Sequence, residues 1–276
     1  LISNSVSGLT AAGGLKSNFK MKKNLFLALC LIALSPLCLK AETIPATDTR
    51  VTFVGRTAVE GTTISFDWTA TYFRIAFSGT SLTMRASDTK WDATPEMAAK
   101  RHNYYNVWID SPTSAEPHRI IEVSGNDTVI ELIDPAYLKK SRRSVHEVIV
   151  QKRTEGEQGK TTIHSFATDG KFFQADKLKS RQLEFIGDSY TCGYGIDAAS
   201  RTERFSPETE NASRSYAGIV SRYFGADYVA IAHSGMGIAR NYNSKFKGWW
   251  MPDRYLQTFD EDSTQVNRWD ATQSDF

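Results

Sequence analysis

The sequence contains few cysteines, little net charge and no long hydrophobic run. Only three of its 276 residues are cysteine, and its longest apolar stretch, Leu25–Leu34, is too short for a membrane-spanning helix, which needs about 20 residues. The formal net charge is +2, and this excess comes from the five lysines within residues 1–41, where there is no acidic residue. We therefore expect neither nucleic-acid binding nor a stable membrane span. The composition, 41% hydrophobic and 23% charged, predicts a folded core, and the length predicts one large or two modest domains.

The residues around the apolar stretch predict export. A basic start at Met21, the apolar run and the small residue Ala41 follow one another in the order of a secretory signal peptide. We interpret residues 1–20 as an upstream extension and 21–41 as the signal, which predicts a secreted or periplasmic protein. Lipid anchoring at Cys38 is an alternative that the preceding leucine disfavours.

Residues 44–178 have the pattern of a β-rich domain. Apolar and polar residues alternate with the period of half-buried strands, and glycine, proline and aspartate separate the segments. About eight short strands without a long helical pattern predict an antiparallel β-sandwich or jelly roll. The predicted strands are Ile64–Trp68, Tyr72–Phe77, Ser81–Arg85, Tyr104–Ile109, Arg119–Val123, Thr128–Ile133, Glu147–Lys152 and Thr161–Ser165, with a loop or short helix at Thr94–Arg101.

The pattern changes near residues 176–181. A strand, a helix and a second strand follow in the order that is typical of a parallel α/β sheet. Residues 181–276 contain only these two clear strands, fewer than an open parallel sheet normally has, so we interpret them as the N-terminal part of an incomplete α/β domain. The segments are the strand Gln182–Ile186, an amphipathic helix Tyr216–Phe224 with Ile219, Val220 and Tyr223 on one side, and the strand Tyr228–Ala232.

The segment Phe185–Gly195 carries the first candidate site. Ser189 follows the first strand of the predicted parallel sheet directly, at the edge where such sheets bind ligands. Gly187 permits a tight turn, and a helix starting here favours negative charge near the serine. This placement suits an acyl-transfer nucleophile with an oxyanion intermediate. The bare Gly-Asp-Ser tripeptide is also compatible with helix capping alone, and the lipase-type Gly-x-Ser-x-Gly elbow is absent.

The second candidate site follows the second strand. The segment Ala232–Tyr242 places Gly235 three residues after the predicted strand end. A glycine here can direct a backbone N–H toward the end of the first strand, as a second oxyanion donor. An ordinary loop between a strand and a helix is the alternative interpretation.

Together these residues resemble a known family. Phe185–Gly195 is similar to block I of the SGNH, or GDSL-type, hydrolases, and Ser234-Gly235 is similar to block II. Val148–Glu155 resembles the segment that joins the two domains of carbohydrate esterase family 2. That family places a jelly-roll domain before a three-layer SGNH domain and removes acetyl groups from plant polysaccharides such as xylan and glucomannan. The resemblance therefore implies domains at 44–178 and 181–276.

The resemblance also implies roles for individual residues. Ser189 would be the nucleophile and would donate its N–H to the oxyanion together with Gly235, while Asp188 would support the turn with Gly187. The family's asparagine of block III and catalytic histidine would lie beyond Phe276, so we expect this chain by itself to be nearly inactive. A serine hydroxyl needs such a base because it is a poor nucleophile at its free pKa. No metal or organic cofactor is implied.

Several other residues need weighing before a function is assigned. Trp249 and Trp250 are candidates for stacking on sugar rings, although packing explains two tryptophans at least as well. His233 is close to Gly235, but the resemblance assigns it no role as a base. Cys192 would be the only cysteine after signal cleavage, so it forms no intramolecular disulfide and is expected to be a small buried residue.

The leading hypothesis is a secreted serine esterase that acts on acetylated polysaccharides or oligosaccharides. The alternatives are a non-catalytic carbohydrate-binding protein and an SGNH esterase or lipase that acts on other esters. Charge and composition do not decide between them.

Overall fold

The computed structural model describes residues 41–91, 94–244, 249–262, 264, 266 and 268–270. The upstream extension, the signal peptide up to residue 40 and Cys38 lie outside the described residues. Within the described part of the chain, no helix has the length and apolarity needed to cross a bilayer.

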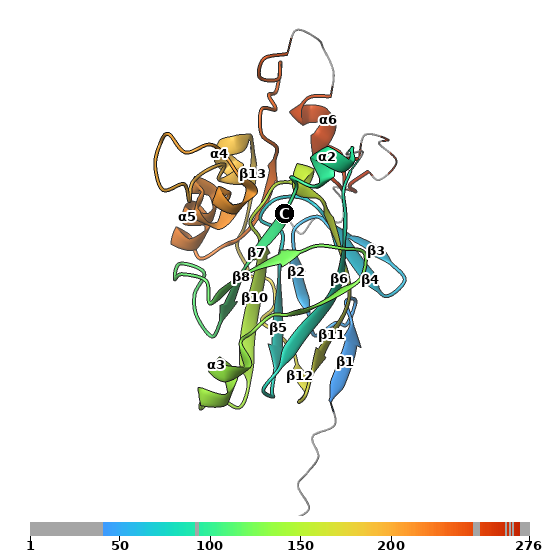
Figure 1. The fold of residues 1–276 in the computed structure, drawn as a ribbon, viewed down its shortest axis with the longest axis vertical. Helices are drawn as coiled ribbons and strands as arrows, with labels where there is room; N and C mark the ends of the chain where they lie inside the picture. Colours follow the sequence, from blue (N-terminus) through green and yellow to red (C-terminus); the bar gives the residue numbers. More distant parts are fainter. Residues whose placement is uncertain are drawn as a thin grey trace, which may run out of the picture. The chain divides into compact units, whose positions relative to one another are not determined.

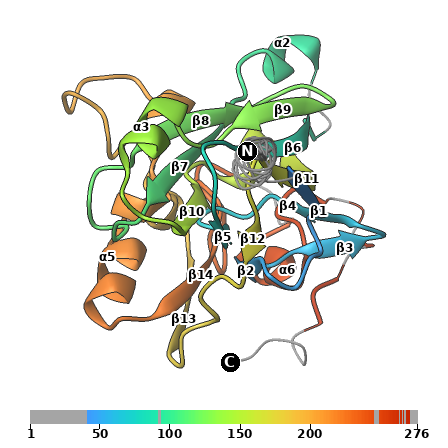
Figure 2. The ribbon, with the colours of Figure 1, turned by 90° about the horizontal axis from the view of Figure 1, so that it is seen from below.

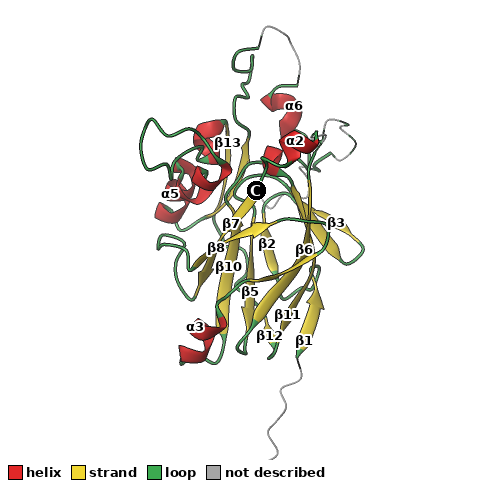
Figure 3. Ribbon diagram, viewed as in Figure 1, coloured by secondary structure: helices red, strands yellow, loops and turns green. Residues whose placement is uncertain are grey.

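Two antiparallel sheets of six strands each form the first part of the chain (Figures 1 and 3). The first sheet has the order β3-β4-β11-β6-β9, with β1 paired to β11. Its strands are β1 (Glu42–Pro45), β3 (Ala58–Glu60), β4 (Thr63–Phe66), β6 (Leu82–Thr89), β9 (Thr128–Glu131) and β11 (Lys160–Thr168). The second has the order β12-β5-β10-β7-β8, with β2 paired to β5. Its strands are β2 (Thr52–Val54), β5 (Tyr72–Phe77), β7 (Asn103–Ile109), β8 (Arg119–Val123), β10 (His146–Lys152) and β12 (Phe172–Phe173).

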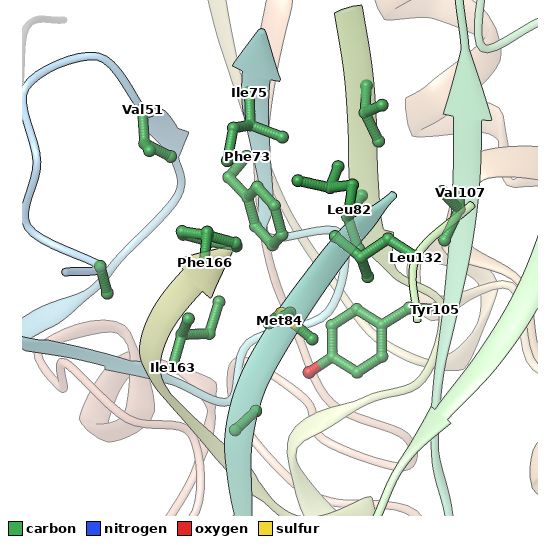
Figure 4. Close-up of a cluster of buried hydrophobic side chains, with 14 of the residues drawn as sticks. Val51, Phe73, Ile75, Leu82, Met84, Tyr105, Val107, Leu132, Ile163 and Phe166 are labelled. Carbon is green, nitrogen blue, oxygen red and sulfur yellow. The ribbon is translucent and has the colours of Figure 1, made fainter. Parts of the chain in front are cut away.

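One hydrophobic core connects the two sheets (Figure 4). In β6 buried residues alternate with more exposed ones, as expected for a strand with one face on a core. Phe73 and Phe166 come from different sheets, and their ring centres are 5.1 Å apart. Burying one such side chain contributes about 1.5–3 kcal/mol, so this aromatic pair contributes to the stability of the described part of the chain, whose one cysteine, Cys192, is free.

All eight predicted strands are confirmed in type, and their ends differ by a few residues. Four strands were not predicted: β1, β2, β3 and β12, each of two to four residues. Such short segments contain too few residues for an alternating pattern, and pairing with a long neighbour defines them instead. The region predicted as a loop or short helix contains α2 (Pro95–Ala98), and further short helices are α3 (Pro135–Lys140) and the 3₁₀ helix η1 (Gly156–Gln158).

The second part of the chain contains the predicted strand–helix–strand unit. β13 and β14 pair in parallel, from Gln182 opposite Asp227 to Gly187 opposite Ala232. The elements are β13 (Gln182–Gly187), α4 (Ser189–Cys192), the 3₁₀ helices η2 (Pro207–Thr209) and η3 (Ala212–Arg214), α5 (Tyr216–Tyr223), β14 (Asp227–Ala232) and α6 (Met251–Tyr255).

Helix α5 buries its small residues and exposes two of the apolar residues that the sequence pattern placed on one side. Ile219 and Tyr223 are 55% and 83% exposed, whereas Ala217, Gly218 and Ser221 are buried. Small side chains let the helix approach β14 and η3 closely, and this close packing decides which face is buried. The predicted helix is confirmed, but its large apolar residues do not form its buried face.

The β-sheets and the strand–helix–strand unit share a second core. Trp68, in the loop after β4, and Tyr72 of β5 pack with Tyr228 and Val229 of β14, which lies beside β2 in Figure 2. The Tyr72 hydroxyl donates a hydrogen bond to Asp227 at 2.8 Å, and the Arg74 guanidinium pairs with the same buried carboxylate. The described residues therefore pack as one unit.

Candidate active site

The parallel pairing of β13 and β14 brings the two candidate segments to the same edge of the sheet. Gly187 and Ala232 are partners at the carboxyl ends of these strands, and the His233 N–H donates to the Gly187 carbonyl at 3.4 Å. Ser189 and Gly235 follow these two positions within three residues. The sequence spacing and the register thus place both segments at the strand ends, where parallel sheets bind ligands.

Ser189 is the first residue of the short helix α4. Asp188 caps this helix, because its side chain accepts a hydrogen bond from the Tyr190 N–H at 3.1 Å. A Cβ on Gly187 would collide with Thr191 Oγ1, so only glycine allows α4 to fold back so closely on β13. The side chain of Ser189 is half-buried and has no hydrogen-bond partner within the described part of the chain. It lines a pocket of about 390 Å³ with Tyr190 and Tyr194.

Gly235 stands in a tight loop after β14. Its φ of 77° lies in the left-handed region, which favours glycine. Its carbonyl accepts a hydrogen bond from the Tyr242 N–H at 2.7 Å, and the Met236 N–H donates to the His233 carbonyl. Among the residues that are described, no backbone acceptor pairs with the N–H of Gly235 or with that of Ser189.

The carboxylate of Glu155 contacts both candidate segments. It is fully buried and accepts hydrogen bonds from the Ser234 N–H at 2.6 Å and from the Ser234 hydroxyl at 2.7 Å. The Cys192 thiol, at the end of α4, lies 3.8 Å from the same carboxylate. Burial raises the pKa of Cys192 well above its usual value, so this cysteine is an inert buried residue, as expected.

His233 belongs to a buried ion-pair cluster. Its Nδ1 lies 2.7 Å from Asp260 Oδ2 and 3.2 Å from Glu261 Oε1. Arg254 donates to Asp260 Oδ1 at 2.6 Å from the other side. Burial by itself would lower the pKa of His233, but the Asp260 carboxylate outweighs burial and raises it to about 9. A charged imidazolium that Asp260 holds in this way is unsuited to act as the base for Ser189.

Other ionisable groups lie under the site. Lys152 is fully buried and donates to the carbonyls of Thr154 and Glu155, and burial lowers its pKa to about 8. Burial and the charge of Glu155 raise the pKa of Glu210 well above its usual value, which favours a protonated carboxyl. Glu210 Oε2 accepts a hydrogen bond from the Glu155 N–H at 3.2 Å.

Among the described residues, two groups of side chains come close enough together to be considered as metal ligands. Both groups are explained by bonds within the protein, because Ser234 donates to both oxygens of Glu155 and because Arg254 pairs with both acids of the second group. The groups are Glu155 with Cys192 and Glu210, and His233 with Asp260 and Glu261.

Trp249 and Trp250 lie beside the Gly235 loop and are half-buried. The Trp249 carbonyl accepts a hydrogen bond from Asn241, and the guanidinium carbon of Arg254 lies 4.0 Å from the Trp249 ring centre. Trp250 begins α6 as its N-cap residue. The Arg254 guanidinium thus covers one face of the Trp249 ring and restricts its orientation.

The sequence analysis did not single out the exposed tyrosines and Glu155. Tyr190 and Tyr242 are 82% and 86% exposed, in the segments that contain Ser189 and Gly235. The rings of Tyr194 and Phe205 are stacked with centres 3.6 Å apart. The aromatic residues near Ser189 and Gly235 in the sequence could have indicated the tyrosines. Glu155 was named only as the end of the segment Val148–Glu155, which resembles a domain junction.

Comparison with known proteins shows similarity to carbohydrate esterases. A profile described as "Carbohydrate esterase 2 N-terminal" matches residues 53–175. An acetylxylan esterase / glucomannan deacetylase of Cellvibrio japonicus is 32% identical over 184 residues, which is 65% of this chain and 44% of that protein. The cellulase/esterase CelE of Acetivibrio thermocellus is 29% identical over 198 residues, 71% of this chain and 22% of that protein.

Solved structures agree with these matches. A family two carbohydrate esterase from Cellvibrio japonicus has a TM-score of 0.71 and 24% identity, and the match covers 84% of this chain and 63% of that one. A family two carbohydrate esterase from Clostridium thermocellum, solved with cellohexaose, has a TM-score of 0.66 and 27% identity, covering 80% and 61%.

The matching profile and both solved structures are described as carbohydrate esterase family 2, and the curated relatives are esterases. The chain is therefore similar to carbohydrate esterase family 2 over the part that matches, in agreement with the resemblance of its motifs. The chain spans less than half the length of the two curated relatives described above.

Proposed function

We propose that the chain is part of a secreted carbohydrate O-acetyl esterase that removes acetyl groups from plant polysaccharides such as xylan and glucomannan. The observation that supports the proposal is the pairing of β13 with β14, whose carboxyl ends are followed by Ser189 and by the Gly235 loop. Among the described residues, neither the Ser189 hydroxyl nor the Gly235 N–H has a hydrogen-bond partner. The acetylxylan esterase activity of a curated relative supports the choice of substrate.

The proposed reaction has two steps. Ser189 Oγ attacks the acetyl carbonyl, and the N–H groups of Ser189 and Gly235 stabilise the oxyanion of the tetrahedral intermediate. The sugar hydroxyl leaves with a proton, and water then cleaves the acetyl-serine. His233 is held in an ion pair with Asp260, so we propose that the general base comes from outside the described residues.

Aromatic side chains around the serine fit a carbohydrate substrate. Tyr190 and Tyr194 line the same pocket as Ser189, and Tyr242 is anchored through its N–H to the Gly235 carbonyl. Flat exposed rings of this kind pack well against the apolar faces of sugars. We propose that Trp249 and Trp250 extend this surface, since Asn241 ties Trp249 to the same loop.

We also propose a domain arrangement for the whole protein. Residues 44–178 would be a jelly-roll domain, and 181–276 the first part of an SGNH-type three-layer domain whose sheet begins with β13 and β14. The residues of β14 are all buried, whereas those of β13 are half-buried or exposed. We propose that further parts of a larger sheet cover β13, which would give it an inner position.

The direct test is acetate release from acetylated xylan and glucomannan by the full-length gene product. Replacing Ser189 with alanine is expected to lower kcat by a factor of about 10⁴ or more, because the nucleophile is lost. The exposed Ser200 offers a matched control, and Ser200→Ala should retain full activity. Residues 42–276 expressed alone are expected to release little acetate, and robust release by that piece would contradict a base outside the described residues.

The same assay separates the alternatives. Glycan binding without acetate release by the full-length protein would favour a non-catalytic carbohydrate-binding protein. Release of fatty acid from longer esters, with none from acetylated polysaccharide, would favour an SGNH esterase or lipase for other esters.

A further inference from the structure

Glu155 lies three residues after strand β10, and its side chain contacts the loop after β14. Both of its carboxylate oxygens accept hydrogen bonds from Ser234, one from the N–H at 2.6 Å and one from the hydroxyl at 2.7 Å. Ser234 directly precedes Gly235, the proposed oxyanion donor. Two short bonds to one residue restrict both the position and the rotation of the peptide that carries the Gly235 N–H.

The backbone of Glu155 is itself firmly held. Its N–H donates to Glu210 Oε2 at 3.2 Å, and its carbonyl accepts from the Lys152 ammonium at 3.0 Å. All three of these residues are fully buried. Because the backbone of Glu155 is fixed, its buried carboxylate has little freedom to move. We therefore infer that the carboxylate determines the position of the Ser234 loop.

The same carboxylate also contacts the nucleophile's helix. Cys192 Sγ lies 3.8 Å from Glu155 Oε2, and Cys192 is the last residue of α4, whose first residue is Ser189. Glu155 therefore touches the two segments whose spacing determines how an ester carbonyl fits between Ser189 Oγ and the Gly235 N–H. A change in this spacing would affect the reaction strongly, because a misplacement of about 1 Å in such a site can lower the rate about 10²-fold.

We propose that Glu155 is a positioning residue that sets the oxyanion loop, through Ser234, against the helix of the nucleophile. The inference rests on the proposed esterase function, and it makes the β-rich part of the chain a component of the active site. Because Glu155 is fully buried behind Ser234, we expect it to act on the transition state through Ser234 and to leave sugar binding unchanged.

The kinetic test compares Glu155→Ala, Glu155→Gln and the control Glu157→Ala in the full-length protein. Glu157 is two residues away, is half-buried and bonds to Gln158 instead of the loop. We expect Glu155→Ala to lower kcat about 10- to 100-fold with KM within about twofold, as for the loss of part of an oxyanion site. Glu155→Gln should recover most of the activity, because an amide can accept from the Ser234 N–H and donate to its hydroxyl. Glu157→Ala should leave both constants unchanged.

A second measurement does not depend on activity. Hydrogen exchange of residues 233–237 is expected to be faster in Glu155→Ala than in the wild type or Glu157→Ala. The losses in kcat of Glu155→Ala and Ser234→Ala should not add in the double variant, since both remove the same interaction. If Glu155→Ala does not fold, Ser234→Ala takes its place in the kinetic and exchange measurements.

The outcomes distinguish the two proposals. Unchanged exchange in a folded variant, or unchanged kcat in an active one, overturns the positioning role of Glu155. Additive losses in the double variant overturn it as well. Faster exchange in a protein whose wild type releases no acetate supports the role of Glu155 and refutes the esterase function.

Discussion

The buried ion pair of His233 makes the stability of the protein depend on pH in a defined direction. His233 is 6% exposed, and its Nδ1 lies 2.7 Å from Asp260 Oδ2. Burial opposes the charged form, but the carboxylate prevails and raises the pKa of His233 to about 9, whereas an unfolded histidine has a pKa of about 6.5. Since each pH unit is worth about 1.4 kcal/mol, the folded state gains about 3 kcal/mol from this proton.

The sign of the effect follows from the raised pKa. Below pH 6.5 the histidine is charged in both states, and the full stabilisation is present. As the pH rises toward 9 the unfolded chain loses its proton first, so the stabilisation falls, and above about 9 it is gone. Replacing His233 with glutamine removes the charge while it retains a hydrogen-bond donor.

The measurement is urea unfolding of the wild type and His233→Gln at pH 6, 7.5 and 9.5. The difference in free energy of unfolding is expected to shrink by about 3 kcal/mol between the lowest and the highest pH. Ser65→Ala is the control, because the Ser65 hydroxyl bonds to the Thr162 hydroxyl at 2.8 Å and a neutral pair adds no pH dependence of its own. A constant difference for His233→Gln would refute the charged ion pair and leave Arg254 as the sole partner of Asp260.

Two further substitutions test the packing that supports the site and the core. Gly187→Ala should destabilise the protein by about 1–3 kcal/mol, because the new methyl group collides with Thr191 Oγ1, and adding Thr191→Ala should recover part of this loss in thermal unfolding. Phe166→Ala should cost about 3–5 kcal/mol in urea unfolding, because Phe166 is fully buried against Phe73, and Phe166→Leu should cost less; equal losses would contradict a close-packed ring at this position.

Local patterns were sufficient for most of the secondary structure. The alternation in the first part of the chain is a property of adjacent residues, so it predicts strands such as Tyr72–Phe77 without knowledge of their neighbours. The positions of Ser189 and Gly235 after two apolar segments likewise predicted their meeting at one sheet edge, because parallel strands end at the same edge.

Local patterns failed where a distant partner decides the outcome. The orientation of α5 is one case, since close packing against β14 selects the small residues for burial and leaves Tyr223 exposed. The edge strands β1 and β2 are another, because three or four residues acquire a strand conformation only through their pairing with β11 and β5.

The chemistry of the site divides in the same way. Periodicity and the order of short motifs indicate a serine at the end of a strand and a glycine loop beside it, because these features depend on neighbouring residues. The contact of Glu155 with Ser234, 79 residues away, and that of His233 with Asp260, 27 residues away, have no local signature. Such contacts form only when the chain folds. The pKa values of the groups involved depend on them too, because folding buries these groups away from water and brings charged partners close.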